Sequence, residues 1–132
     1  MIVVDTNVIT YLWLSGDHTE SAERALRRDP DWSAPLLWRS EFRNVLAGYL
    51  RRDLVDLAGA VRIAEEAEAQ MRGREFAVPA SMMLDRAAAS GCSAYDCEFV
   101  VLAEELSVPL VTTDAQVLDA FPSIAQPLAE FG

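Results

Sequence analysis

Short apolar segments alternate with longer segments of helical periodicity along this chain. In residues 2–5 and 109–112 the apolar side chains are consecutive rather than alternating, which is typical of strands buried on both faces of a sheet. Three weaker patterns of similar length lie between helical segments. Strands are therefore predicted at residues 2–5, 32–34, 75–78, 109–112 and 123–125.

The segments between these strands carry apolar residues at the three- and four-residue spacing of amphipathic helices. Short strands that alternate with helices indicate an α/β fold with a parallel sheet. The 132 residues contain no internal repeat, low-complexity tract or linker, so a single domain spanning residues 1–132 is predicted. Helices are predicted at residues 7–14, 19–28, 36–52, 56–72, 81–90, 93–106 and 114–120.

Two aspartates lie at the carboxyl ends of the most apolar strands. Asp5 follows the apolar residues 2–4, and Asp114 follows residues 109–112 after one intervening residue, Thr113. The carboxyl ends of parallel strands share one edge of the sheet, and ligands bind at that edge near the point where strand order reverses. If the two strands are neighbours, the two carboxylates meet there. Each aspartate also has a purely local interpretation, as the N-cap of the helix that follows it.

Two further acids lie toward the packed side of predicted helices. Glu41 is four residues from Leu37 and four from Val45, which places it at the edge of the apolar stripe. Asp96 is four residues before Val100 and shares its face. These positions differ from those of ordinary solvated acids, which lie opposite the apolar stripe.

Both of these acids also have ordinary structural interpretations. Glu41 is a helix-surface glutamate if it pairs with Arg39 or Arg43. Asp96 fits a capping box with Ser93, and carboxylates are favoured in the first turn of a helix. Each acid taken alone therefore fits either a site role or an ordinary structural role, and a functional site requires all four to lie together.

Four carboxylates at one sheet edge would repel one another and raise one another's pKa. Such a cluster is stable at neutral pH if it holds a hard divalent cation, and Mg²⁺ and Mn²⁺ prefer oxygen ligands. A metal held in this way lowers the pKa of bound water and stabilises the transition state of phosphodiester cleavage. Other acids of the chain, Glu98 among them, are predicted to be solvated.

The composition narrows the class of chemistry. The formal net charge is −10, which disfavours a general polyanion binder but not a nuclease with an acidic metal site. All 11 cationic side chains are arginine. The absence of lysine excludes haloacid-dehalogenase phosphatases, response-regulator receivers and P-loop proteins. No glycine-rich loop follows the first strand, which excludes the dinucleotide-binding fingerprint. The only histidine, His18, lies in a polar turn and is predicted to be exposed.

The cysteines, the apolar runs and the N-terminus bear on the redox state and the cellular location of the protein. Cys92 and Cys97 are predicted to be buried reduced thiols, because five residues of helix separate them by about 7.5 Å. No apolar run approaches the roughly 20 residues of a membrane helix. The N-terminus lacks the features of a signal peptide. A cytoplasmic protein with no membrane partner is predicted.

Four short motifs together resemble those of the PIN domain, and more closely the VapC-type toxins of bacterial toxin–antitoxin pairs. They are the D-T-N at the end of the first strand, "WRSEFRNVL", "SAYDCEFVVLAEEL" and "PLVTTD". The resemblance extends from residue 1 to about residue 125. It implies a three-layer α/β/α fold with a central parallel sheet of four or five strands. It also implies endoribonuclease activity that depends on Mg²⁺ or Mn²⁺.

The resemblance assigns roles to individual residues. Asp5 and Asp96 match the main metal ligands, and Glu41 and Asp114 match acids that hold water or a second metal. Together these four form the expected catalytic and metal-binding set. The matching supporting positions are Thr6, Asn7 and Thr112.

The resemblance also implies a homodimer, an RNA substrate and a cognate VapB-type antitoxin whose C-terminal segment covers the active-site groove. A strongly acidic toxin suits a basic partner. Arg39 and Arg43 flank Glu41 and are predicted to contact RNA or the antitoxin. Two alternatives stay open: a non-catalytic PIN module that grips a basic peptide, and a related metal-dependent DNA nuclease.

Overall fold

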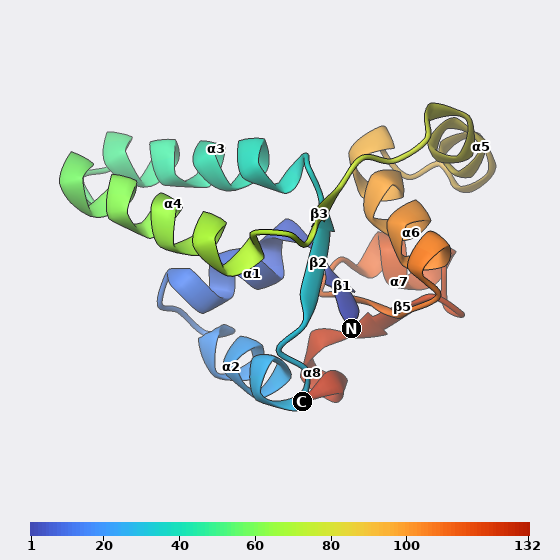
Figure 1. The fold of residues 1–132 in the computed structure, drawn as a ribbon, viewed down its shortest axis with the longest axis horizontal. Coiled ribbons are helices and arrows are strands. Elements are labelled where there is room, and N and C mark those ends of the chain that lie inside the picture. Colours follow the sequence, from blue (N-terminus) through green and yellow to red (C-terminus); the bar gives the residue numbers. More distant parts are fainter.

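The computed structural model describes residues 1–132, and its centre is a five-stranded sheet (Figure 1). The strand order is β3-β2-β1-β4-β5, and every neighbouring pair is parallel. This confirms the predicted parallel sheet at the upper of the two expected strand numbers. The strands are β1 (Ile2–Val4), β2 (Trp32–Pro35), β3 (Glu75–Phe76), β4 (Leu110–Thr112) and β5 (Ala125–Pro127).

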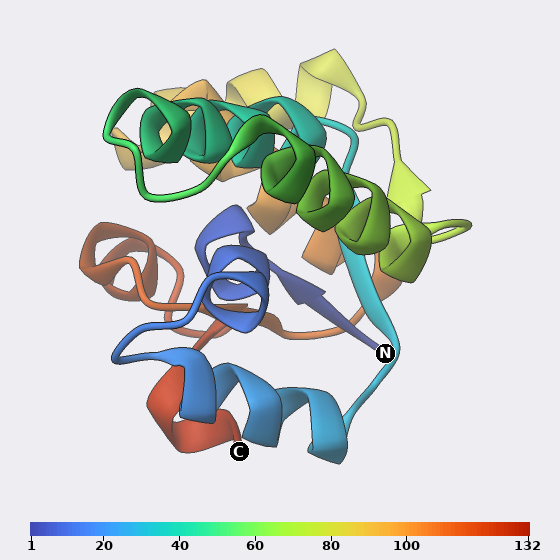
Figure 2. The same cartoon turned by 90° about the vertical axis from the view of Figure 1, so that its left-hand side faces the viewer.

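Eight helices surround the sheet and complete a three-layer α/β/α fold. Helices α1 and α4 pack against one face of the sheet, and α6 packs against the other. Figure 2 views the molecule from the side of α1 and α4, with these helices in front of the strands. The helices are α1 (Thr6–Trp13), α2 (Thr19–Arg28), α3 (Trp38–Arg51), α4 (Leu57–Met71), α5 (Ala80–Ser90), α6 (Ala94–Leu106), α7 (Ala115–Ala120) and α8 (Leu128–Phe131).

The hydrophobic core contains 24 buried residues from both sides of the sheet. All three residues of β1 are buried, as the continuous apolar pattern predicts for a central strand. Every residue of helix α6 from Phe99 to Ala103 is buried, because α6 covers the face of the sheet opposite α1 and α4. Cys92 and Cys97 are buried and not bonded to each other, which confirms the prediction of reduced thiols.

The C-terminal part differs from the prediction. A strand was expected at residues 123–125, but the backbone N–H groups of Ile124 and Ala125 both donate to the carbonyl of Phe121 and close a turn. The strand therefore begins at Ala125 and ends at Pro127. Proline has no N–H to donate to a neighbouring strand, and it is tolerated here because β5 lies at the edge of the sheet. Helix α8 follows at once and was not predicted.

None of the helices has both the length and the apolar character that a membrane crossing requires. His18 is exposed, as predicted, and its ring lies 4.5 Å from that of Tyr11.

Candidate functional site

The candidate site lies at the carboxyl edge of the sheet, where β1 and β4 end side by side. These two strands are paired with Val4 opposite Val111, and the N–H of Asp5 donates to the carbonyl of Val111 at 3.2 Å. The chain proceeds from β1 to β2 and β3 on one side and then returns to β4 on the other. Strand order thus reverses between β1 and β4, which is the usual ligand position in an open α/β sheet.

Thr112, the last residue of β4, links the two aspartates at this edge. Its hydroxyl donates to Oδ2 of Asp5 and accepts the backbone N–H of Asp114 at 3.0 Å. The side chain of Thr112 is buried, so this geometry is fixed by packing as well as by hydrogen bonds. The predicted meeting of the two strand ends is therefore present in the structure.

Both aspartates also cap the helices that follow them. Oδ1 of Asp5 accepts the N–H of Val8 at 3.0 Å and begins α1. Oδ1 of Asp114 accepts the N–H groups of Gln116 and Val117 at 2.9 and 3.2 Å and begins α7. The local interpretation and the site interpretation are therefore compatible, because Oδ2 of Asp114 takes no part in the cap and each oxygen of Asp5 keeps a second lone pair.

Glu41 and Asp96 reach the same place from the first turns of α3 and α6. Oε1 of Glu41 accepts the hydroxyl of Thr6 at 2.6 Å. The N–H of Asp96 donates to the hydroxyl of Ser93 at 3.1 Å, which is the predicted cap of α6. All four acids thus lie at helix N-termini, where the helix dipole favours negative charge.

These elements enclose a small cavity of about 60 Å³, enough for a few water molecules or a partly hydrated ion. All four predicted acids and all three predicted supporting residues line it, so the structure brings the whole predicted set together. Three apolar side chains that were not predicted complete its walls. The lining residues are Asp5, Thr6, Asn7, Glu41, Asp96, Phe99, Leu110, Thr112, Asp114 and Val117.

The environment of the cavity favours the protonated form of three of its acids, Asp5, Glu41 and Asp96. Burial raises the pKa of Asp5 to about 6, and the charges of Asp114 and Asp96 add to this effect. Burial also raises the pKa of Glu41, with a smaller contribution from Asp96. The pKa of Asp96 is raised by burial and then by Asp114. The sequence predicted that mutual repulsion would raise these pKa values; repulsion contributes, but burial is the larger cause.

The donor set fits a hard divalent cation, because every polar side chain that lines the cavity offers oxygen and none is an arginine. The side chains as they stand do not form a ready ligand shell: no group of three or more carboxylate, histidine or cysteine side chains is arranged to hold a metal ion. Metal binding at this cavity would therefore require the carboxylates to rotate toward a common centre.

Glu98 departs from its prediction as a solvated acid. It is half-buried on α6, and its pKa is raised by burial and then by the charge of Glu41. The sequence offered one signal for this, namely the position of Glu98 just before the apolar run that begins at Phe99.

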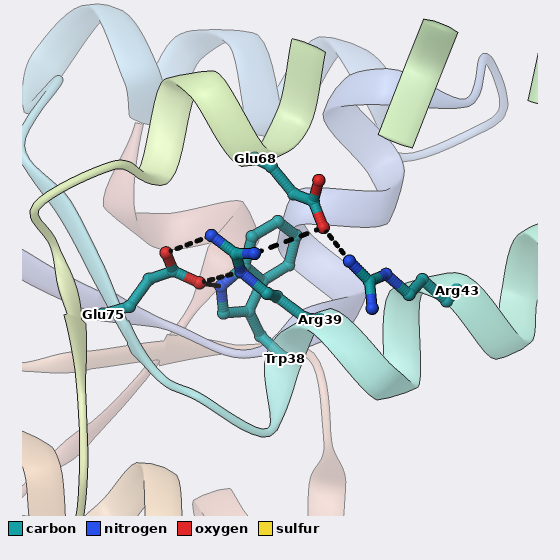
Figure 3. Close-up of polar contacts among 5 residues, drawn as sticks. All are labelled: Trp38, Arg39, Arg43, Glu68 and Glu75. Atoms are coloured by element: carbon teal, nitrogen blue, oxygen red, sulfur yellow. Dashed lines mark hydrogen bonds and ion pairs between the residues drawn. The ribbon is translucent and has the colours of Figure 1, made fainter. Parts of the chain in front are cut away.

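Arg39 and Arg43 do not line the acidic cavity. Figure 3 shows both arginines directed toward other carboxylates. Nε and one terminal nitrogen of Arg39 donate to Glu75 at 2.6 and 2.8 Å, and a second ion pair joins Arg39 to Glu68 at 3.6 Å. Arg43 also pairs with Glu68. The alternative in which these arginines pair with Glu41 is wrong, and their contact with RNA or an antitoxin stays a prediction.

Comparison with protein families and curated proteins gives two matches. The family model described as "PIN domain" matches residues 2–122. The protein named "Ribonuclease VapC3" from Pyrobaculum aerophilum is 29% identical over 129 residues, which cover 96% of this chain and 98% of that protein.

Solved structures give the same architecture. The chain resembles FitAcB from Neisseria gonorrhoeae with a TM-score of 0.77 and 17% identity, over 98% of this chain and 99% of that one. It resembles VapC20 from Mycobacterium tuberculosis, described as a "Sarcin-Ricin loop cleaving toxin", with a TM-score of 0.62 and 18% identity. That likeness covers 87% of this chain and 91% of VapC20. At these identities the two likenesses concern the fold.

Proposed function

Because this chain belongs to the PIN domain family, we propose that it is an endoribonuclease that depends on Mg²⁺ or Mn²⁺ and acts as the toxin of a toxin–antitoxin pair. One observation carries the proposal. Four carboxylates from four separate segments line one cavity at the topological switch point, and no arginine neutralises them there. The name of the relative from Pyrobaculum aerophilum, a ribonuclease, supports RNA as the substrate.

In this proposal each residue of the cavity has a distinct task. Asp5 and Asp96 would hold the cation, and Glu41 and Asp114 would hold the water or a second cation. A bound divalent cation would supply the Lewis acidity that lowers the pKa of water and stabilises the charge of the phosphodiester transition state. The remaining residues keep these carboxylates in place.

The supporting residues act through hydrogen bonds already present. The hydroxyl of Thr112 holds Oδ2 of Asp5, and the hydroxyl of Thr6 holds Oε1 of Glu41. Each of these bonds fixes one oxygen and leaves the carboxylate a second lone-pair direction for a ligand. Phe99, Leu110 and Val117 limit the access of bulk water, which strengthens electrostatic interactions inside the cavity.

The partners follow from the charge of the molecule and from the relatives. A chain of net charge −10 with an acidic cavity suits a basic antitoxin segment that covers the cavity and offers it a cationic side chain. We include a homodimer and a cytoplasmic location in the proposal, as the resemblance to VapC-type toxins implies.

A second candidate function is a non-catalytic PIN module that grips a basic peptide in this acidic cavity. The observation that favours it is the arrangement of the acids, which do not form a ready metal site. A peptide cation would relieve the raised pKa values of Asp5 and Glu41 in the same way as a metal would.

The deciding experiment is digestion of RNA by the purified protein in Mn²⁺, with Asp5→Asn and Asp96→Asn. Each substitution removes one charge but keeps the shape of the side chain, so we expect a loss of cleavage of at least about 10³-fold. Asp119→Asn is the matched control, because Asp119 is an exposed acid on α7 away from the cavity. Cleavage that survives both site substitutions would overturn the proposed site, whereas a wild type that cuts no RNA in Mn²⁺ would favour the peptide-binding module.

A further inference from the structure

A second cavity opens beside the acidic one, and Glu41 lines both. Its volume is about 230 Å³, and its other lining residues are Leu37, Ser40, Asn44 and Tyr95. Leu37 is the N-cap of α3, and Ser40 and Asn44 lie on its first and second turns. Tyr95 lies on the first turn of α6. The cavity thus lies between the same two helix turns that present Glu41 and Asp96.

Tyr95 is the most distinctive of these residues. It directly precedes Asp96, and 60% of it is exposed although its ring is large and apolar. An exposed aromatic ring next to a nuclease centre is a stacking surface for an unpaired base. Ser40 and Asn44 are also exposed and offer a hydroxyl and an amide, which can donate to or accept from the edge of such a base.

The charges nearby favour stacking as the source of RNA affinity. No arginine lines either cavity. Arg39 and Arg43 are the cations on the same part of α3; Arg39 pairs with Glu68 and Glu75, and Arg43 pairs with Glu68 (Figure 3). An RNA strand therefore makes no arginine–phosphate contact inside the two cavities, although such contacts usually dominate binding. Contact with a base is a contribution that the lining of the second cavity can itself offer.

We propose that this second cavity receives the nucleobase beside the scissile phosphate, with Tyr95 stacking on the base and Asn44 contacting its edge. The proposal rests on the proposed RNA cleavage, and it adds to it a residue that governs which bases flank the cut. It makes Glu41 the boundary between the cavity for the phosphate and the cavity for the base.

The first test is digestion of a randomised single-stranded RNA pool in Mn²⁺, with sequencing of the new ends. We expect wild type to show a base preference at a position adjacent to the cut. Tyr95→Ala should weaken that preference and raise KM by about tenfold with little change in kcat, as expected for the loss of one stacked base. Tyr95→Phe keeps the ring and should behave like wild type. Asn44→Ala should change which base is preferred.

Tyr49→Ala is the matched control. Tyr49 is a partly exposed tyrosine on α3, its ring contacts Arg52, and it lines neither cavity. If Tyr95→Ala cuts the pool with the same KM and base preference as Tyr49→Ala, the inference is wrong. If Tyr95→Ala changes the oligomeric mass but not RNA cleavage, Tyr95 belongs to a protein interface and the inference is also wrong.

A second measurement separates this inference from the proposed function. A single-stranded RNA that contains 2-aminopurine is titrated with protein in Ca²⁺, and the fluorescence of the base reports stacking without any need for cleavage. Quenching by wild type and by Tyr95→Phe, but not by Tyr95→Ala, supports the base cavity even in a protein that does not cut RNA. Absence of quenching by wild type, or equal quenching by Tyr95→Ala, overturns the inference.

Discussion

Two glutamates near the first turn of α3 have opposite environments. Glu75 accepts hydrogen bonds from Arg39 and Trp38, and the bond from Arg39 is the main cause of its lowered pKa. Glu41 accepts one bond, from the hydroxyl of Thr6, and burial raises its pKa. Only one residue separates Arg39 from Glu41 in the sequence, yet the guanidinium of Arg39 lies against β3.

The ion pairs around Glu75 stabilise the fold, whereas the acids around Glu41, which lack a cation, destabilise it. Arginine satisfies the carboxylates of the network formed by Trp38, Arg39, Arg43, Glu68 and Glu75 (Figure 3), and this network joins α3 to α4 and β3. The acids of the cavity have no cation from the chain itself. A binding site for an external cation requires such unpaired acids, and their burial and mutual repulsion lower the stability of the protein until the cation binds.

The largest effect should come from supplying the missing cation. Mn²⁺ at 100 times its Kd should raise the free energy of unfolding by about 2.7 kcal/mol, because it binds only the folded state. Thermal unfolding with and without Mn²⁺ measures this. Glu75→Gln should keep the full response and Asp5→Asn should lose it. A wild type that does not respond would mean that the cavity does not hold a metal.

The next effect should come from breaking the satisfied network. Glu75→Gln removes the negative charge and one of the two carboxylate oxygens that accept hydrogen bonds from Arg39. It should lower the free energy of unfolding by about 2 kcal/mol. Urea denaturation measures the change. Glu65→Gln, an exposed glutamate of α4 with no ion pair, is the control and should change stability by less than about 0.5 kcal/mol. Equal effects of the two substitutions would contradict the importance of the network.

A smaller effect of opposite sign is expected from Asp5→Asn without metal. The pKa of Asp5 is 3.8 without the fold and about 6 in it, so the folded state binds more protons than the unfolded state between these pH values. Its contribution to stability is therefore favourable below about pH 4 and is lost as pH rises through 6. Asp5→Asn should stabilise the protein by about 1–2 kcal/mol at pH 8 and have little effect near pH 4.

Urea denaturation across this pH range, in EDTA, tests the prediction for Asp5. Thr112→Val gives a useful comparison, because it removes the hydroxyl that holds Oδ2 of Asp5 and should raise the pKa further. An Asp5→Asn protein that is less stable than wild type at every pH would show that the hydrogen bonds of this carboxylate outweigh its loss of water.

The smallest effect should come from Arg43→Gln. The side chain of Arg43 is 59% exposed, so its ion pair with Glu68 is screened by water and should contribute less than about 0.5 kcal/mol. The loss should shrink further in 0.5 M salt. If instead Arg43→Gln lowers RNA cleavage without changing stability, the predicted contact of Arg43 with RNA gains support.

The sequence predicted the parts of the site that depend on strand ends and helix faces. Asp5 and Asp114 follow consecutive apolar residues, and Glu41 lies at the edge of an apolar stripe, so local patterns were enough to place them. The pairing of Arg39 with Glu75 could not be predicted, because it depends on how β3 lies against α3, 36 residues earlier in the chain. Glu98 was missed because its raised pKa comes from burial in the folded chain and from the charge of Glu41, which lies on a different helix.

The C-terminal strand shows a different limit. A strand was predicted at residues 123–125, but a turn that begins at Phe121 takes the backbone N–H groups of Ile124 and Ala125, which a strand would need. Pairing with Leu110 to Thr112 then fixes the register two residues later. Tertiary pairing overrode the local pattern, as is common for short edge strands.

The four acids come from segments that lie far apart in the sequence, and one consequence concerns kinetics. A cation held by Asp5, Glu41, Asp96 and Asp114 would join the first strand, α3, α6 and the last third of the chain as a reversible cross-link. Because these residues lie far apart in the sequence, we expect them to come together only after most of the sheet has formed, so that such a cross-link slows unfolding and leaves the folding rate unchanged. Occupancy of the site would then govern resistance to proteases that act on the opened chain.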